Sequence, residues 1–361
     1  MLFTIVIKTC LTLIVLMGVL NLAGLLTWVE RKQSAIIQDR IGANRASIFG
    51  IRILGLLHPL ADAIKMFLKE DYVPPKASKI LFNLAPFLSV VFALVAFAAV
   101  PFGNTVVIAG REISLQVASI NVGLLYIFAM VSMGLYGVIL AGYASKNNYA
   151  FLGGLRATSQ MLSYEITMGV SILGLVMVYR TLDLQEMVRA QGDYLFGWLP
   201  KWGIITQPLA FFLFATAAMA ETKRVPFDLP EGESEIIGYF VEYSGMKFGM
   251  YFLTDFVETV LPSARFTTFF FGGWQIPYLA TDGLHFPWGS SILMGSWGVA
   301  LLGVLAFSIK VAFFCWLLMM VRWTLPRFRY DQLMQLGWKI MFPLSLANIL
   351  VTGLVLLWFK P

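Results

Sequence analysis

Long apolar stretches dominate this sequence of 361 residues and restrict what it can fold into. Hydrophobic residues make up 59% of the chain, whereas Asp, Glu, Lys and Arg make up only 13%, about half the charged share of an ordinary soluble domain. A helix that crosses a bilayer core needs about 20 apolar residues. Eight segments meet this requirement, at residues 4–29, 80–101, 119–144, 158–180, 205–221, 239–261, 294–321 and 340–359. The sequence therefore predicts an all-α integral membrane protein with eight transmembrane helices, in one polytopic domain over residues 1–361.

A ninth apolar segment, residues 51–68, has a different pattern. It also contains Arg52, His58, Asp62 and Lys65, and its apolar residues recur at spacings of three and four. Asp62 and Lys65 would lie on one face of such a helix. We expect an amphipathic helix here, either at the membrane interface or re-entrant, and packed against protein.

The distribution of Lys and Arg predicts the orientation in the membrane. Alternate connections between the spans carry 17 of these residues on one side, and the other side carries 7. The richer side is expected to be cytoplasmic, so both termini should face outward. This bias explains the net charge of +6 without nucleic-acid binding. The outer segment 262–293 is rich in Phe, Trp and Tyr, as in an interfacial aromatic belt.

Residues typical of metal and nucleotide sites are scarce. The two cysteines, Cys10 and Cys315, and the two histidines, His58 and His285, lie far apart and lack the spacing of zinc or iron–sulfur ligands. The sequence contains neither G-x-G-x-x-G nor G-x-x-x-x-G-K-[ST], the loops that hold nucleotide phosphates. We therefore expect this chain to bind no metal and no redox cofactor of its own.

An acidic segment on the predicted cytoplasmic side, residues 221–242, is the main chemical feature. It contains six carboxylates within 22 residues: Glu221, Asp228, Glu231, Glu233, Glu235 and Glu242. Aromatic and aliphatic residues lie between them, so the segment should be partly shielded from water. Crowded carboxylates in such a place cannot all ionise at low cost, which suits groups that take up and release protons. A solvated acidic loop is the alternative.

Ionisable residues also occur inside the predicted spans. Glu165 lies in the fourth span, Asp255 and Glu258 lie in the sixth with Lys247 earlier on it, and Lys310 lies in the seventh. A charged side chain at the centre of a bilayer costs at least about 2.5–3.5 kcal/mol, so each should have a partner. These residues are expected to form either structural ion pairs or an ion or proton relay.

A second charged group lies at the predicted cytoplasmic end of the first span. It comprises residues 30–32, followed by Arg40 and Arg45, and then Asp62 and Lys65 on the amphipathic segment. Lys and Arg at a membrane edge commonly set topology alone. The same arrangement could hold the polar head of a lipid-soluble ligand while apolar residues hold its tail.

The acidic segment also carries a family resemblance. Residues 220–235, AETKRVPFDLPEGESE, resemble the signature of the quinone-site membrane subunits of respiratory complex I. That family includes the H-type subunit of bacterial NADH:quinone oxidoreductase and mitochondrial NADH dehydrogenase subunit 1. Further matches occur in the expected order at residues 30–32, 61–65, 69–70, 148–150, 155–157, 163–165, 242–248 and 327–334.

The resemblance implies a proton-translocating complex in which quinone is the substrate and this chain holds no redox centre and no catalytic residue. FMN and iron–sulfur clusters would lie on partner subunits, and the partners would be the hydrophilic quinone-site subunits and the antiporter-like membrane subunits. By motif match, the quinone-binding residues are Arg31, Arg40, Asp62, Phe227 and Asp228. The proton-path residues by the same match are Glu165, Glu221, Glu231, Glu233 and Asp255.

Some positions depart from the family pattern. Ala43 follows Gly42 where the family usually has Pro, the loop after it is longer, and Asp255 stands where Glu is common. We therefore expect a differently shaped loop at the mouth of the quinone-binding chamber that the resemblance implies. Two alternatives remain: the homologous anchor subunit of a membrane-bound hydrogenase or formate hydrogenlyase-type complex, and a stand-alone ion transporter.

Overall fold

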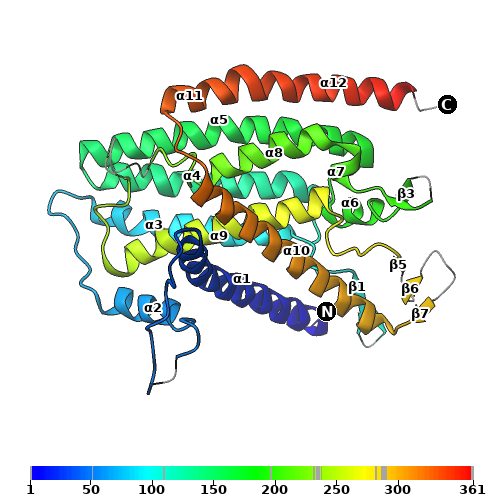
Figure 1. Cartoon of the computed structure of the whole chain (residues 1–361), viewed down its shortest axis with the longest axis horizontal. Helices are drawn as coiled ribbons and strands as arrows, with labels where there is room; N and C mark the ends of the chain where they lie inside the picture. The colour runs from blue at the N-terminus through cyan, green and yellow to red at the C-terminus, as the bar shows by residue number, and fades with distance from the viewer. Residues whose placement is uncertain are drawn as a thin grey trace.

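Helices form most of this computed structural model, which describes residues 2–358 except 51, 109, 196, 231, 233–235, 237, 281–282 and 286–290. Figure 1 shows the long helices running side by side, with the short strands gathered at one end. The helices are α1 (Leu2–Ile37), α2 (His58–Leu68), α3 (Lys79–Val95), η1 (Ala96–Ala99), α4 (Gly123–Ala144), α5 (Asn148–Tyr179), α6 (Leu184–Ala190), α7 (Gly203–Thr206), α8 (Pro208–Glu221), α9 (Gly245–Phe270), α10 (Ser296–Thr324), α11 (Tyr330–Gln335), η2 (Leu336–Met341) and α12 (Phe342–Trp358).

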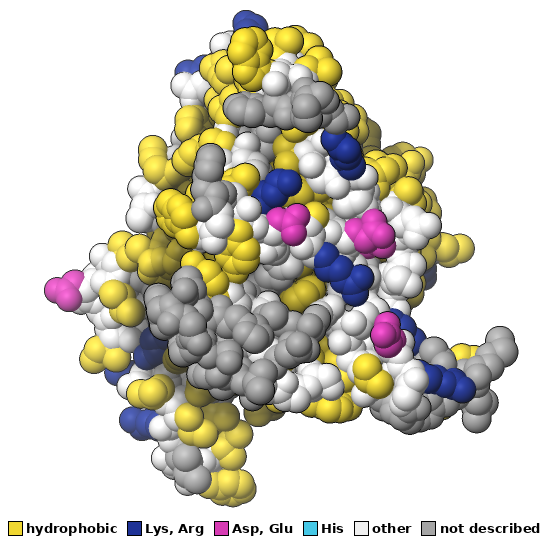
Figure 2. Space-filling view, turned by 90° about the vertical axis from the view of Figure 1, so that its right-hand side faces the viewer, with side chains coloured by type: hydrophobic (Ala, Val, Ile, Leu, Met, Phe, Trp, Pro, Cys, Tyr) yellow, Lys and Arg dark blue, Asp and Glu magenta, His cyan; other side chains and the backbone are white. Residues whose placement is uncertain are grey.

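The strands form three small antiparallel sheets. The first pairs β1 (Thr105–Ile108) with β2 (Arg111–Ser114), and the second pairs β3 (Tyr194–Leu195) with β4 (Leu199–Pro200). The third has the order β5 (Leu279–Ala280), β6 (Gly283–His285), β7 (Ser291–Leu293). Figure 2 looks at this end of the bundle and shows Lys, Arg, Asp and Glu side chains gathered near its centre, with hydrophobic side chains around them.

Six helices of the described chain are long and apolar enough to cross a membrane: Ile5–Ile37, Lys79–Ala99, Gly123–Ala144, Asn148–Tyr179, Ser296–Thr324 and Tyr330–Trp358. These six correspond to six of the eight expected spans. The other two expected spans fall on α8, which has 14 residues, and on α9, which carries four charged residues. Length and composition therefore show a multi-pass membrane protein, with six clear spans.

The boundaries of several expected spans needed correction. Span 205–221 is divided between α7 and α8, because Gln207 leaves the helical conformation and Pro208 starts a new helix. The fourth span begins earlier, at Asn148, where the Asn147 side chain caps the helix by accepting the Tyr149 N–H at 3.0 Å. The expectation of an amphipathic helix over 51–68 is correct only from His58 onward. α2, all of whose residues are described, buries none of them and packs against α1 and α9.

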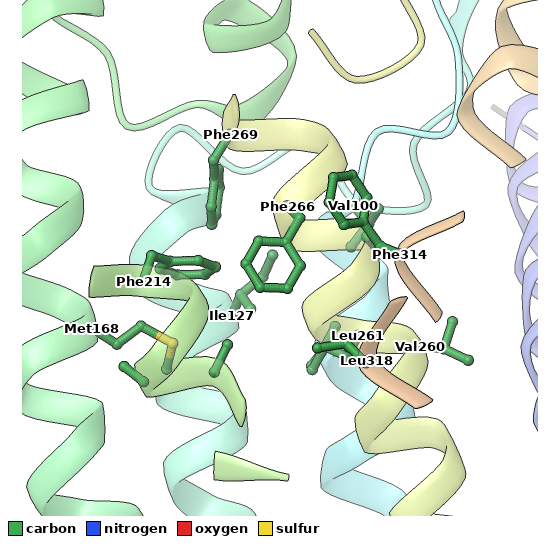
Figure 3. Close-up of a cluster of buried hydrophobic side chains, with 14 of the residues drawn as sticks. Val100, Ile127, Met168, Phe214, Val260, Leu261, Phe266, Phe269, Phe314 and Leu318 are labelled. Carbon is green, nitrogen blue, oxygen red and sulfur yellow. The ribbon is translucent and has the colours of Figure 1, made fainter. Parts of the chain in front are cut away.

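The aromatic segment after residue 262 is not simply an interfacial belt. Phe269 and Phe270 belong to α9 and are fully buried in the core of this chain. Figure 3 shows Phe269 and Phe266 of α9 pointing towards Phe214 of α8, and the Phe214 ring meets the other two edge-on, with centroids 5.7 and 5.3 Å away. Such edge-to-face pairs are a favoured aromatic geometry. The α9 helix therefore continues to Phe270, beyond residue 261, where the sequence predicted the end of the sixth span.

Small residues bring α3 and α4 close together, as is typical of helices that pack within membranes. At Gly137 of α4, a Cβ atom would lie 2.9 Å from the Ala85 carbonyl oxygen of α3. Any side chain there would force the two helices apart, and Gly137 therefore fixes their spacing.

Candidate functional site

A cavity of about 450 Å³ lies between α1, α9, α10 and the segment after α8. Its walls combine charged side chains with an aromatic surface. The lining residues are Thr27, Glu30, Arg31, Ser34, Arg224, Phe240, Phe248, Tyr251, Phe252, Asp255, Phe256, Arg322 and Trp323. We call it the large cavity. Its volume lies within the range of about 300–1,000 Å³ that is usual for small-molecule sites.

Glu30 organises the charged wall of the large cavity. Its carboxylate accepts hydrogen bonds from Arg224, at 3.1 Å, and from Arg322. The Arg224 guanidinium also lies over the Phe256 ring, 4.3 Å from its centroid, which is a favourable place for a cation. Three helices and the segment after α8 are thus tied together around one carboxylate, and two guanidinium groups remain beside the cavity as hydrogen-bond donors.

A second, mainly apolar cavity of about 150 Å³ lies between α1, α2 and α9. We call it the side cavity. Thr27 and Phe252 line both cavities, so the two adjoin. Arg31 lines the large cavity and Asp62 lines the side cavity, and their side chains form an ion pair of 2.5 Å. Lys65 lies 3.9 Å from Asp62, as the three-residue spacing predicted.

Phe227 and Asp228 lie behind the large cavity and line the described surface of neither cavity. Both are buried, and the Phe227 ring stacks on Phe328 with centroids 5.5 Å apart. Asp228 pairs with Arg327 at 2.9 Å. Burial raises the pKa of the Asp228 carboxyl, although the Arg327 guanidinium opposes this shift. The segment before them is fixed by the Gln160 amide, which donates to the carbonyl oxygens of Ala220 and Phe227 at 2.7 Å each.

Arg40, like Phe227 and Asp228, lines neither cavity of the described structure. Its side chain is exposed and donates to the Gln38 side chain at 2.7 Å. Figure 1 shows the connection between α1 and α2 extending away from the bundle, beyond α2. The altered and lengthened loop after Gly42 is part of this connection.

A buried group of acids and bases begins at the wall of the large cavity. Asp255 lines that cavity, and the Lys223 ammonium lies 3.8 Å from Asp255 and 3.1 Å from Glu258. Lys223 is only 2% exposed. Burial alone would lower the pKa of Lys223, but Glu258, Tyr239 and Asp255 together raise it well above its ordinary value, so the side chain remains a cation.

The group continues to Glu221 at the end of α8. Glu221 accepts two hydrogen bonds from Arg265 of α9, and both side chains are buried. A small cavity of about 10 Å³ is lined by Glu221, Glu258 and Arg265, together with apolar residues. That volume is about what a single water molecule requires.

Glu165 forms the far end of this group. It lies on α5, accepts a hydrogen bond from Ser132 of α4 and interacts electrostatically with Glu221 and Arg265. The structure thus brings together three of the expected proton-path residues, Glu165, Glu221 and Asp255. The other two, Glu231 and Glu233, lie outside the described residues, as does Glu235.

Two cations predicted inside spans, Lys247 and Lys310, lie apart from the group of Asp255, Glu258 and Lys223. Lys247 pairs with Asp71 at 2.9 Å rather than with Asp255 or Glu258, which lie eight and eleven residues further along α9. Lys310 donates to the carbonyl oxygens of Phe271, Gly273 and Gln275 at 2.7–3.0 Å, just beyond the end of α9. Neither arrangement supports the sequence-based hypothesis of a relay at these positions.

Sequence reasoning missed the basic half of the site. Lys223, Arg224 and Arg265 were noted only as charges that set topology, yet all three are buried against carboxylates. One signal was present: Arg265 lies among apolar residues, and a cation there needs a partner. The identity of that partner depends on tertiary structure, since 44 residues separate Arg265 from Glu221.

Comparison with known proteins gives a consistent assignment. The family model described as NADH dehydrogenase matches residues 9–353. A Cytophaga hutchinsonii protein, named as an H-type subunit of NADH-quinone oxidoreductase, is 48% identical over 334 residues, which cover 92% of each chain. A Thermomicrobium roseum protein named in the same way is 46% identical, over 94% of this chain and 93% of its own. A Bdellovibrio bacteriovorus protein, also named as this subunit, is 40% identical, over 98% and 97%.

Proposed function

This chain belongs to the NADH dehydrogenase family, and from that premise we propose that it forms the quinone chamber of a proton-translocating NADH:quinone oxidoreductase. The chain is a multi-pass membrane protein and works as a subunit of an enzyme complex of this class. FMN and iron–sulfur clusters on partner subunits supply the electrons, and quinone is the substrate. The names of the relatives favour this function over a hydrogenase-type anchor or a lone transporter.

The observation that supports this proposal best is the pair of adjoining cavities. A quinone has a head with two carbonyl oxygens, which accept hydrogen bonds, and an apolar tail. The large cavity offers guanidinium donors at Arg31, Arg224 and Arg322, beside aromatic side chains. The side cavity is mainly apolar and adjoins it at Phe252, next to the amphipathic helix α2. The head would occupy the large cavity, and the tail would extend through the side cavity towards the bilayer.

The proton coupling in this proposal is electrostatic. Reduction of quinone to quinol takes two electrons and two protons, so the charge of the large cavity changes at each step. Asp255 lines this cavity, and its change in protonation would be felt by Glu221 and Glu165 because charges interact strongly in a medium of low dielectric constant. The antiporter-like subunits would lie on the Glu165 side, and the hydrophilic subunits would cover Asp228. Both termini would face the periplasm.

Blocking the passage between the cavities tests the proposal. Phe252→Trp adds volume where the two cavities meet, and should strongly reduce NADH:quinone reductase activity while electron transfer from NADH to ferricyanide is retained. Phe87→Trp, at an exposed apolar position of α3, is the matched control and should leave both activities unchanged. Parental quinone reduction by an assembled Phe252→Trp complex would contradict the proposed chamber.

A further inference from the structure

Lys223 lies between Asp255, which lines the large cavity, and Glu258, which lines the small one, although Lys223 lines the described surface of neither cavity. We propose that Lys223 is a positioning residue that lets a single proton reside on either of two carboxylates, Asp255 at the large cavity or Glu258 at the small one. Its coupling role rests on the proposed function, whereas the shared proton is a property of this chain alone.

The geometry places one flexible cation between two acids on the same helix. Asp255 and Glu258 are three residues apart on α9, so their side chains lie on one face. The Lys223 ammonium lies nearer to Glu258, at 3.1 Å, than to Asp255, at 3.8 Å. Both the Asp255 Oδ1 and the Glu258 Oε2 atoms are buried and lack a well-aligned hydrogen bond from the described residues. The ammonium is therefore within reach of both carboxylates and is not locked onto either of them.

Charge balance favours one proton in the triad of Lys223, Asp255 and Glu258. With both carboxylates ionised, the triad carries one net negative charge, whereas one added proton makes it neutral. A neutral triad is favoured because an unbalanced charge is costly away from water. Further charged or titratable groups near the triad come from several of the surrounding elements: Glu30 (α1), Glu165 (α5), Glu221 (α8), Arg224, Asp228 and Tyr239 (segment after α8), Arg265 (α9) and Arg322 (α10).

The proposed step conserves atoms and charge. When Asp255 holds the proton, the ammonium pairs with the ionised Glu258, as its shorter distance in the structure suggests. When the O–H bond at Asp255 breaks and one forms at Glu258, the ammonium moves to Asp255. One proton has then passed from the large cavity to the small one, and Lys223 has remained charged throughout. The long side chain of lysine, which ends in a compact ammonium group, suits such a change of partner.

Infrared spectroscopy of the purified complex near neutral pH tests the shared proton without requiring turnover. Parental complex should show one protonated carboxyl group that disappears in Asp255→Asn and in Glu258→Gln alike, because the single remaining acid then ionises opposite Lys223. The control Asp71→Asn, which removes the exposed partner of the mostly buried Lys247, should retain this band. Loss of the band in only one of the two variants, or in neither, would overturn the inference.

Proton pumping tests the role of Lys223 in coupling. Lys223→Gln should lower the number of protons pumped per NADH oxidised, and Lys223→Arg should restore part of it. The charge-balanced double variant Lys223→Gln/Glu258→Gln should assemble normally but pump poorly. Parental pumping by this double variant would mean that Lys223 only neutralises Glu258, and would overturn the coupling role. The proposed function is tested separately, by quinone reduction in the parental complex.

Discussion

Asp228 and Arg327 join two connections that lie far apart in the sequence, with 2.9 Å between the carboxylate and guanidinium atoms. The same two connections meet twice more nearby. The Phe328 N–H donates to the Pro226 carbonyl oxygen at 3.0 Å, and the Phe328 ring stacks on Phe227. The segment after α8 and the connection from α10 to α11 thus form one layer behind the large cavity.

The stability of this layer should depend on pH through Asp228. Burial raises the pKa of its carboxyl above the ordinary 3.8, and Arg327 only partly opposes this. The contribution of this carboxyl to the free energy of unfolding is therefore fully present below pH 3.8. It is lost as pH rises through the pKa of the carboxyl in the folded state. An Asn at this position cannot ionise, so the Asp228→Asn complex should not lose this stability. We therefore expect the melting temperature of the variant minus that of the parental complex to increase from about pH 4 to about pH 7.

The expected result is the sign of this trend: the difference in melting temperature should grow as pH rises. Thermal unfolding of the purified complex at several pH values measures it. Asp331→Asn, in an exposed pair with Arg329, is the control and should show no such trend. A difference that stays constant or falls with pH would show that ionisation of Asp228 does not cost stability.

Arg31 should contribute to quinone binding. Arg31→Ala removes a donor at the junction of the two cavities, and the loss of one charged hydrogen bond of about 1.5 kcal/mol corresponds to about a tenfold rise in KM for quinone. The ferricyanide activity should remain parental. Lys65→Ala, which alters an exposed side chain 3.9 Å from Asp62, should change KM little. If Arg31→Ala lowers both activities equally, failed assembly is the cause and the site assignment loses its support.

The buried pair of Glu221 and Arg265 should be essential for assembly. Glu221→Gln leaves the Arg265 guanidinium without its counter-charge, at a cost of about 3–5 kcal/mol. We expect low abundance of the subunit in membranes, measured by immunoblotting. The double variant Glu221→Met/Arg265→Met should restore much of the abundance, because apolar residues can replace a buried ion pair. Normal abundance of the single variant would show that the pair is not needed for folding.

Glu165 should affect pumping rather than abundance if it belongs to the proton path. Glu165→Gln should reduce turnover and proton uptake together, whereas Glu165→Asp should retain part of both. Ser132→Ala, which removes the hydrogen bond from α4, should have a smaller effect. The measurement is proton uptake per NADH oxidised in reconstituted vesicles, normalised to assembled complex. Full rate and full pumping in Glu165→Gln would remove this residue from the mechanism.

Much of the helical architecture was predictable because a bilayer requires long apolar helices. Six expected spans correspond to helices that meet this requirement. The break at Gln207 and Pro208 was missed, because hydropathy averages over a window and does not register one non-helical residue. The extension of α9 to Phe270 was missed because Arg265 lowers the mean hydropathy there, although it is paired inside the bundle. The start of α9 at Gly245 was missed because residues 239–241 are apolar but not helical.

The site was predictable only in part. The pairing of Asp62 with Lys65 follows from helical spacing, and family resemblance pointed to Arg31 beside Asp62. Contacts such as that of Lys223 with Glu258, 35 residues apart in the sequence, arise only when α8 and α9 pack together. The exposed position of Arg40 was also not predictable, because the loop after Gly42 departs from the family pattern.

The central claim is that this chain encloses the quinone head, and electron microscopy of the assembled complex with bound quinone tests it most directly. The account predicts head-group density in the large cavity, within hydrogen-bond distance of Arg31, Arg224 or Arg322, and tail density passing Phe252 towards α2. Quinone density bound wholly by other subunits, with the cavity of this chain filled only by water or side chains, would contradict it.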